Sequence, residues 1–243
     1  MHLIDGDFPL GSLFPGLRPS DLLASGDVIR VDAAAGDVIF TEGDTDNRLF
    51  LLGFGRVQVG LSGRDGRECT FTVLGPGEVF GEESVFDPGP RGSSATAITD
   101  ICALSLGRQA VMSLMLADPQ IANGFLRVLA RRIRRAHGNI TDAVYADVAA
   151  RVAKQLLGLA QRFGVQEDGA MRVPMDLTQQ QFAHLVGTSR ESVNKALCHF
   201  AERGWIAIGA DSIVIRESEP LAVRMHGARR SGRRTEDASL TAG

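Results

Sequence analysis

The chain has 243 residues, 44% of them hydrophobic, which is long enough for two domains with cores of their own. Its formal net charge of −3 would by itself exclude a strongly basic nucleic-acid-binding protein. The charge is unevenly distributed, however. Residues 1–120 hold 8 Lys and Arg against 17 Asp and Glu (net −9), whereas residues 121–243 hold 18 against 12 (net +6). Any contact with nucleic acid is therefore expected in the second half.

Cysteine content and hydropathy limit the class of protein further. Cys69, Cys102 and Cys198 are odd in number and lack the spacing of metal ligands, so we expect neither a disulfide framework nor a metal site. No signal peptide opens the chain, and no apolar run approaches the roughly 18 residues of a membrane span. These features predict a cytoplasmic protein without a membrane partner.

Residues 28–106 are made of short β-type runs broken by glycine, and several alternate in polarity, as Val57, Val59 and Leu61 do. Many short strands at nearly regular spacing predict an antiparallel barrel or roll. Metal-dependent cupin enzymes share this shape but need histidine ligands inside it, and His2 is the only histidine before residue 137. We therefore predict no catalytic residues and no enzyme. The predicted strands are Val28–Val31, Val38–Phe40, Leu49–Phe54, Arg56–Leu61, Thr70–Leu74 and Ile101–Leu106.

A long helix is predicted from Pro119, which suits a first helical position, to about Tyr145. Its apolar residues recur at alternating spacings of three and four, the seam of a two-stranded coiled coil. A second stripe of Ile121, Phe125 and Val128 is placed to cover the roll. The alternative is a helix that packs wholly on its own domain. We expect a homodimer through the seam residues Leu126, Leu129, Ile133, Ala136, Ile140 and Ala143.

After a further helix over residues 147–164, residues 177–197 have the pattern of a helix-turn-helix. Thr178 and Ser189 are suited to cap its two helices, and Gly187 can take the left-handed conformation of the turn. Two β-branched runs, Ile206–Ile208 and Ile213–Ile215, follow as a hairpin. A helix-turn-helix followed directly by a hairpin predicts a winged helix. Its wing can touch the sugar-phosphate backbone while the second helix lies in the groove.

The second helix is predicted to expose side chains suited to base edges in double-stranded DNA. Arg and Lys donate to guanine, and Glu accepts from cytosine N4. An ordinary helical hairpin with a solvated charged face is the alternative. The expected DNA-contacting residues are Thr178, Gln179, Ser189, Arg190, Glu191, Asn194 and Lys195.

Cys198 lies on the same helix face as Lys195. We expect either simple packing for this cysteine or a redox-sensitive position near the DNA.

The glycine-rich segment Gly77–Ala97, GEVFGEESVFDPGPRGSSATA, is the second chemical feature. Gly81 can bring backbone N–H groups close to an anion. Glu82 can accept from ribose hydroxyls, and Arg91 can pair with a phosphate.

The order of elements over residues 14–220 resembles the cyclic AMP receptor/FNR family of bacterial regulators. That order is a roll, a glycine-rich segment, a long helix and a winged helix. The stretches FDPGPR, LRVLARR, RVAKQLL and SRESVNKAL resemble its actinobacterial members. The resemblance implies an α+β fold with a cyclic-nucleotide-binding roll, a dimerisation helix and a C-terminal winged helix-turn-helix. It also implies a palindromic operator similar to TGTGA-N6-TCACA, read by Arg190, Glu191 and Lys195, and RNA polymerase as a partner.

In the family's ligand site, Gly81 and Glu82 would match the glycine and the ribose-binding glutamate, and Arg91 the phosphate-binding arginine. This chain departs from the family at several positions. Gly92 stands where a hydroxyl residue follows the arginine, so that Ser93 or Ser94 would have to compensate, and Glu83 replaces an apolar residue. The pair that faces the adenine is Ala136 and His137.

We therefore expect a weak or absent response to cyclic AMP, the one candidate ligand. Whether the segment is kept only as a scaffold is left open. Two alternatives remain open. One is a cyclic-AMP-activated factor with an intact effector site, and the other is a ligand-sensing regulatory subunit that acts through protein contacts. The expected domains are the roll (1–118), the dimerisation helix and hinge (119–146), the winged helix (147–220) and a basic tail (221–243) that we expect to be disordered.

Overall fold

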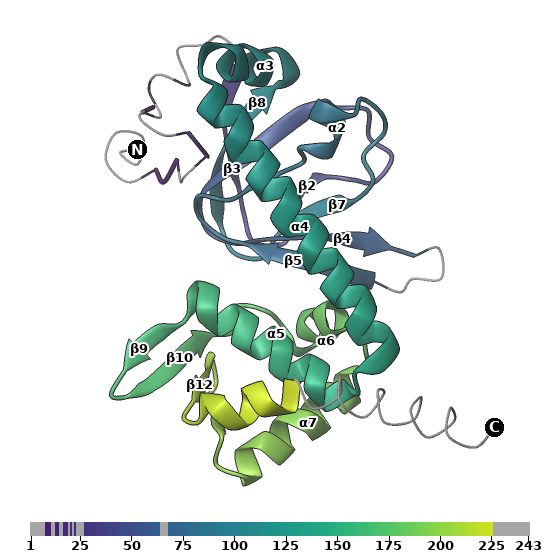
Figure 1. The fold of residues 1–243 in the computed structure, drawn as a ribbon, viewed down its shortest axis with the longest axis vertical. Helices are drawn as coiled ribbons and strands as arrows, with labels where there is room; N and C mark the ends of the chain where they lie inside the picture. Colours follow the sequence, from purple (N-terminus) through teal and green to yellow (C-terminus); the bar gives the residue numbers. More distant parts are fainter. Residues whose placement is uncertain are drawn as a thin grey trace, which may run out of the picture. The chain divides into compact units, whose positions relative to one another are not determined.

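A computed structural model of the chain describes residues 8–10, 13–14, 17–18, 20, 22, 27–63 and 68–225. The chain divides into two compact units, Met1–Ile133 and Arg134–Gly243 (Figure 1). The boundary lies inside the long helix α4, Pro119–Tyr145.

The first unit is a roll of two antiparallel four-stranded sheets, as predicted. The first sheet has the order β1-β8-β3-β6, and the second has the order β2-β7-β4-β5. The predicted strands are observed to within two residues at each end. The bounds are β1 Val28–Ala33, β2 Val38–Phe40, β3 Arg48–Phe54, β4 Val57–Ser62, β5 Glu68–Leu74, β6 Val79–Phe80, β7 Ser94–Ala97 and β8 Ile101–Gly107.

The first sheet is buried on both faces because its strands contribute to two separate hydrophobic cores. Phe50 and Leu52 of β3 point into a core between the two sheets. Leu49 and Leu51 of the same strand belong to a second core on the opposite face, as the side-chain alternation of a strand requires. All seven residues of β8 are buried as a consequence.

The second core is closed by helices. It includes Val111 of α3, Arg108–Ala117, and Ile121 and Phe125 of α4. The rings of Phe14 and Phe125 meet edge to face, with centroids 6.0 Å apart. The apolar stripe expected to cover the roll therefore does so, and it leaves the coiled-coil seam of α4 on another side of the helix. A short helix, α2 Glu83–Phe86, follows β6.

The second unit contains the winged helix, with one strand pair more than predicted. Its helices are α5 Val148–Phe163, α6 Gln179–Val186 and α7 Arg190–Glu202. Its sheet has the order β11-β12-β10-β9, made of β9 Val165–Glu167, β10 Ala170–Pro174, β11 Ile206–Ile208 and β12 Ser212–Ile215. The predicted α+β class, with a roll, a long helix and a winged helix-turn-helix, is confirmed.

Polar contacts tie the N-cap and the middle of α5 to their surroundings within this unit. Lys154 of α5 contacts Asp142 and Asn139 of α4, and Asp142 is only 8% exposed. Arg224 pairs with Asp147, the N-cap of α5. Arg224 lies in a helix over residues 218–225, so the chain is still regular where the basic tail was expected to begin. The rest of that tail, residues 226–243, lies outside the described residues.

Within the described ranges, none of the helices combines the length and the apolar character needed to cross a membrane. The same stretches of chain hold no cluster of three or more His, Cys, Asp or Glu residues that could bind a metal ion.

Candidate nucleic-acid interface and effector site

The helix-turn-helix is built by local hydrogen bonds that its sequence supplies. Thr178 caps α6 in a reciprocal capping box. The Gln181 N–H donates to Thr178 Oγ1 at 3.1 Å, and the Thr178 N–H donates to Gln181 Oε1 at 2.8 Å. Helix α6 ends at Gly187, whose φ of +74° is a left-handed conformation that favours glycine. Ser189 then caps α7 by accepting from the Ser192 N–H at 3.2 Å.

One face of α7 is buried and the other is exposed, as the sequence predicted. Val193, Ala196, Leu197 and Phe200 pack inward. Arg190, Glu191 and Lys195 are exposed, and Asn194 is half-buried. Cys198 is also exposed on this helix. The structure thus places the candidate base-reading side chains together over the first turns of α7, and Thr178 and Gln179 stand beside them at the start of α6.

The charges on this surface are set by the start of the helix. The free backbone N–H of Glu191 and the Ser189 hydroxyl hold the pKa of the Glu191 carboxyl below its ordinary value. Glu191 is therefore ionised at neutral pH and can act only as a hydrogen-bond acceptor. The side chain of Arg190 is oriented by Gln179, whose Oε1 accepts from Arg190 Nε at 2.8 Å.

The wing and α5 support the same surface. Trp205, just before β11, stacks on Phe200 of α7 with ring centroids 5.6 Å apart, which fixes the hairpin against the helix. From α5, Arg151 Nη2 donates to the Gly187 carbonyl in the turn at 3.4 Å.

The β9–β10 hairpin that the sequence reading missed turns at Asp168 and Gly169, both with positive φ. This Asp-Gly pair is the signal that predicts such a turn.

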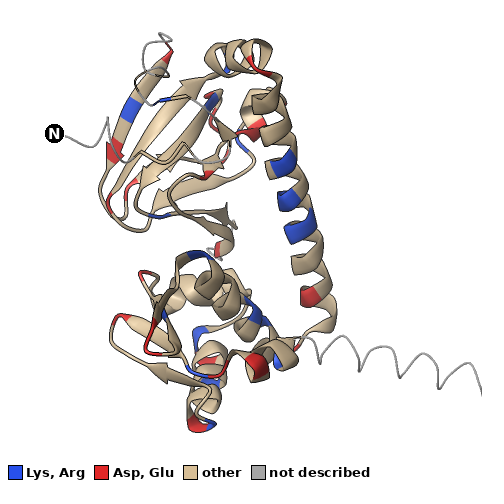
Figure 2. Cartoon of the chain, turned by 60° about the vertical axis from the view of Figure 1, so that its left-hand side comes forward, with Lys and Arg blue, Asp and Glu red and all other residues tan. Residues whose placement is uncertain are grey.

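The large apolar residues of the α4 seam are left exposed by the part of the chain that the structure describes. Leu126, Ile133 and Ile140 are 63%, 56% and 63% exposed. Ala136 and Ala143 are exposed as well, and Leu129 is half-buried. Basic residues lie along the middle of α4 (Figure 2). Arg127 and Arg134 directly follow the seam residues Leu126 and Ile133, and both are exposed, as is Arg131. An exposed row of large apolar residues bordered by charges is typical of a surface that binds another protein chain.

The glycine-rich segment forms a polar cluster in the first unit. Glu82, which is 1% exposed, pairs with Arg132 of α4 through Oε1, and Arg132 also donates to the Val79 carbonyl. Burial raises the pKa of the Glu82 carboxyl, against the opposing effect of Arg132. Arg132 was not among the predicted site residues. Its position one turn after Val128, which packs on the roll, was the available signal.

Arg91 is buried and held by the protein itself. Its Nη1 donates to the Gly81 carbonyl at 2.8 Å and its Nη2 to the Arg48 carbonyl at 2.7 Å. The guanidinium lies over the Phe40 ring, 4.1 Å from its centroid. Gly81 has a φ of +74°, and a Cβ there would lie 2.5 Å from Arg91 Nη1, so this close approach requires glycine.

Two polar atoms of this cluster are buried without a hydrogen-bond partner among the described residues, Glu82 Oε2 and Arg91 Nε. An acceptor and a donor left in this state suit a ligand that brings a hydroxyl group and an anionic oxygen. A sugar phosphate has both groups. The cluster therefore fits part of a cyclic nucleotide.

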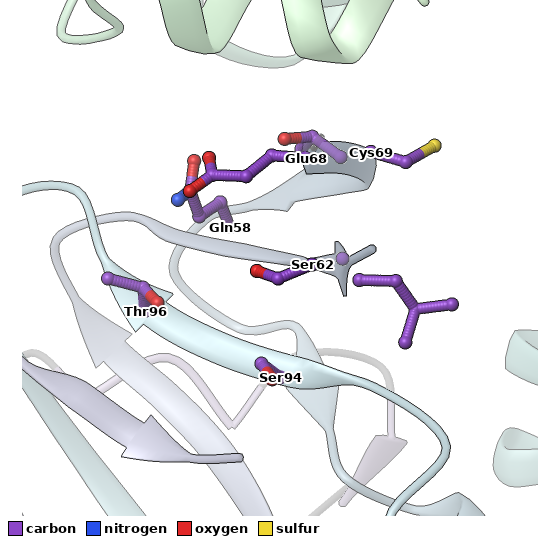
Figure 3. A pocket seen from close by; sticks show the side chains of 9 residues that line it. Gln58, Ser62, Glu68, Cys69, Ser94 and Thr96 are labelled. Carbon is purple, nitrogen blue, oxygen red and sulfur yellow. The ribbon is translucent and has the colours of Figure 1, made fainter. Parts of the chain in front are cut away.

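Of the two hydroxyl groups expected to replace the missing one at Gly92, that of Ser94 already has a partner in the protein. Ser94 and Ala95 are neighbours on β7, and the side chain of Ala95 lies in the core. The Ser94 Oγ accepts a hydrogen bond from the Glu42 N–H at 2.9 Å. Figure 3 shows Ser94 and Thr96 lining a separate pocket. That pocket holds about 60 Å³, well below the roughly 300 Å³ or more of small-molecule sites.

The other ligand-site candidates are distributed as follows. Ser93 is buried. Glu83 lies beside Gly92, where a Cβ would stand 3.3 Å from Glu83 Oε2. Ala136 and His137 are exposed on the part of α4 that belongs to the second unit.

Comparison with known proteins agrees with both halves of the fold. Residues 30–118 match the cyclic nucleotide-binding domain, and residues 150–224 match the Crp-like helix-turn-helix domain. The chain is 50% identical to the CRP-like cAMP-activated global transcriptional regulator of Mycobacterium tuberculosis over 213 residues, which cover 87% of this chain and 95% of that protein. It is 33% identical to the cyclic AMP receptor protein of Thermus thermophilus, over 85% and 93% of the two chains.

Solved structures show the same fold. A CooA mutant from Carboxydothermus hydrogenoformans superimposes with a TM-score of 0.74 at 19% identity, over 90% of this chain and 96% of that one. A CRP/FNR-family transcriptional regulator from Thermus thermophilus gives a TM-score of 0.68 at 25% identity, over 82% and 98%.

A cyclic-nucleotide-binding domain joined to a Crp-like helix-turn-helix defines a class of bacterial transcription regulators rather than enzymes. The chain belongs to the CRP/FNR family. Regulators of this family bind DNA and act as dimers.

Proposed function

We propose that this protein is a homodimeric, cytoplasmic regulator that reads a palindrome similar to TGTGA-N6-TCACA and acts together with RNA polymerase. The observation that carries the proposal is the exposed first turn of α7, where Arg190 and Glu191 follow the Ser189 cap and Lys195 stands one turn later. Arg190 is assigned to a guanine, Glu191 to a cytosine N4, and Lys195 to a guanine or thymine edge. Family membership supports the operator type.

Dimerisation is proposed through the α4 seam. The seam residues Leu126, Ile133 and Ile140 are exposed in the single chain, and a two-fold partner would cover them. A two-fold protein presents two α7 helices to half-sites about one helical turn apart, which is the geometry of a palindrome.

The test is selection of binding sites from a random DNA pool, followed by titration of the selected duplex against a shuffled one. We expect a palindrome with TGTGA-like halves and a preference of at least about a thousandfold over shuffled DNA. An unrelated motif without two-fold symmetry would contradict the assignment of α7.

For the effector, we propose that cyclic AMP binds weakly and changes operator affinity little. Arg91 and Glu82 already have protein partners that a nucleotide must displace or share. Gly92, Ala136 and His137 lack the groups that family members offer to phosphate and base, and Glu83 adds a negative charge beside Gly92.

A cyclic-AMP-activated regulator is the second candidate. The unpartnered Glu82 Oε2 and Arg91 Nε favour it, as does the name of the Mycobacterium tuberculosis relative. Calorimetry with cyclic AMP and cyclic GMP distinguishes the two, because only the second candidate predicts submicromolar binding.

A further inference from the structure

One side-chain amide oxygen of the helix-turn-helix accepts hydrogen bonds from two candidate base-reading residues. Gln179 Oε1 accepts from Arg190 Nε at 2.8 Å and from Asn194 Nδ2 at 3.3 Å. Arg190 and Asn194 stand one turn apart on α7, and Gln179 is the first residue of α6. The three side chains form a cluster across the two helices, which we call the Gln179 clamp.

The position of Gln179 is set by the start of its own helix. The capping box of Thr178 and Gln181 encloses Gln179 on both sides and fixes the backbone from which its side chain projects. The buried residues Phe182 and Ala183 lie one turn further along and anchor α6 in the core. Gln179 therefore projects from a rigid base, although its side chain is exposed.

The clamp leaves free the part of Arg190 that recognises guanine. Bidentate recognition of guanine O6 and N7 needs two parallel N–H groups on one guanidinium edge. Because Nε is engaged by Gln179, the terminal Nη1 and Nη2 pair is the edge left for the base. A long arginine side chain loses much rotamer freedom when it binds, and a side chain already oriented loses less.

We propose that Gln179 is a positioning residue that sets the base specificity of α7 by orienting Arg190 and Asn194. This inference rests on the proposed DNA-binding function and deepens it. Gln179 then contributes to discrimination between bases through Arg190, rather than through a contact of its own with the phosphate backbone. A direct phosphate contact predicts the opposite pattern, because such contacts add affinity for every sequence alike.

The experiment compares variants of the full chain on the duplex that wild-type protein selects from a random pool. Gln179→Met keeps the length of the side chain and removes the acceptor, whereas Gln179→Glu keeps an acceptor oxygen and adds a negative charge. Gln180→Met is the matched control, because Gln180 is the exposed neighbour on α6 and its side chain contacts His184 in its own helix. Thermal unfolding checks that each variant is folded.

Discrimination is measured as the dissociation constant for a substituted duplex divided by that for the selected duplex. In each substituted duplex, one half-site guanine is replaced by 7-deazaguanine or adenine. Wild type is expected to discriminate by about fivefold or more at the guanine that Arg190 reads. Gln179→Met should lower that ratio at least threefold and leave affinity for a shuffled duplex unchanged within twofold. Gln179→Glu should keep the ratio while its affinity for every duplex falls, and Gln180→Met should behave as wild type.

A second comparison tests whether Gln179 acts through Arg190. In an Arg190→Ala background, adding Gln179→Met should cause no further loss of guanine discrimination. An equal further loss would overturn the clamp. The clamp is also overturned if the Gln179→Met protein discriminates between bases as wild type does. It is overturned likewise if the Gln179→Met and Gln179→Glu proteins lose affinity equally for all duplexes while the discrimination ratio stays unchanged. A wild-type protein that selects no sequence would overturn the proposed function as well.

Discussion

Arg132 reaches from α4 to the carboxylate of Glu82 and provides its only positively charged partner among the described residues, while the second oxygen of that carboxylate stays unpaired. Burial raises the pKa of Glu82 above its ordinary value near 4.5. The folded protein therefore holds this proton to higher pH than the unfolded chain does. The stability that the protonated group contributes is complete below that ordinary pKa and is lost as the pH rises through the folded-state pKa.

Glu82→Gln removes this titration. We expect the free energy of unfolding of wild type to fall relative to that of the variant as the pH rises above about 4.5. Urea unfolding of both proteins between about pH 4 and 7 measures the difference. Two curves that stay parallel over that range would contradict the raised pKa.

Introducing the polar groups that the family resemblance implies around cyclic AMP should strengthen its binding. We combine Gly92→Ser with Glu83→Ala, because a Cβ at position 92 lies 3.3 Å from Glu83 Oε2, and add Ala136→Thr and His137→Asn. Each recovered hydrogen bond contributes about 1 kcal/mol, so calorimetry should find the combined variant binding at least tenfold more tightly than wild type. Submicromolar binding to wild type, with a tenfold gain in operator affinity, would contradict the prediction.

Glu191→Ala should relax the choice of base at one position in each half-site. The variant loses the acceptor assigned to a cytosine N4, so discrimination at that pair should fall about tenfold while affinity for shuffled DNA stays within twofold or rises slightly. Fluorescence anisotropy with single-substitution duplexes measures this. Glu202→Ala, at the other end of α7, is the matched control. A uniform loss across all duplexes would point to a structural role instead.

Ile133→Asp should convert the dimer to a monomer, because the charge would be buried without a partner at the centre of the seam. Ile133 is 56% exposed in the single chain, so the folded unit should tolerate the change. Sedimentation velocity is expected to show the monomer, with loss of operator binding. Leu116→Asp on α3, where Leu116 is 85% exposed, controls for the loss of a surface apolar residue. A dimeric Ile133→Asp protein would mean that the seam lies elsewhere.

Glutathionylation of Cys198 should weaken DNA binding and be reversed by dithiothreitol. In the reaction with glutathione disulfide, the Cys198 thiolate attacks one sulfur, forms a mixed disulfide with that glutathione and releases the other as a thiolate. The attached glutathione is a bulky anion on the exposed side of α7, where it would repel the approaching DNA. Cys198→Ser should bind normally after treatment. Cys69→Ser should remain sensitive, because Cys69 is also exposed but lies in the other unit. Equal sensitivity of the Cys198→Ser protein would leave Cys198 without a redox role.

Sequence patterns predicted most of this fold because its signals are local. Pro119 and the apolar repeat predicted α4 from end to end, and Thr178, Gly187 and Ser189 predicted the helix-turn-helix through their capping roles. The same local reasoning missed α3, whose N-terminus has no side-chain cap and follows a strand directly.

The site was predicted less completely, because its contacts link residues far apart in the chain. Arg132 lies 50 positions from Glu82 and Arg48 lies 43 from Arg91, and no spacing rule relates such pairs. Gln179 was singled out as a DNA contact, but its bond to Arg190 depends on the crossing of α6 and α7. The family resemblance named residue roles without showing that Arg91 and Glu82 are engaged by the protein.

The contact of Lys154 with Asp142 and Asn139 bears on how the DNA-binding part of this molecule is isolated for study. A fragment that begins at Asp147, directly after the expected hinge, would lack both residues that Lys154 contacts on α4. Expression of residues 134–225 would keep them, together with the Arg224–Asp147 pair at the far end of the sequence. A fragment of this half for spectroscopy or crystallisation should therefore begin inside α4, although domain boundaries are usually placed in linkers between helices.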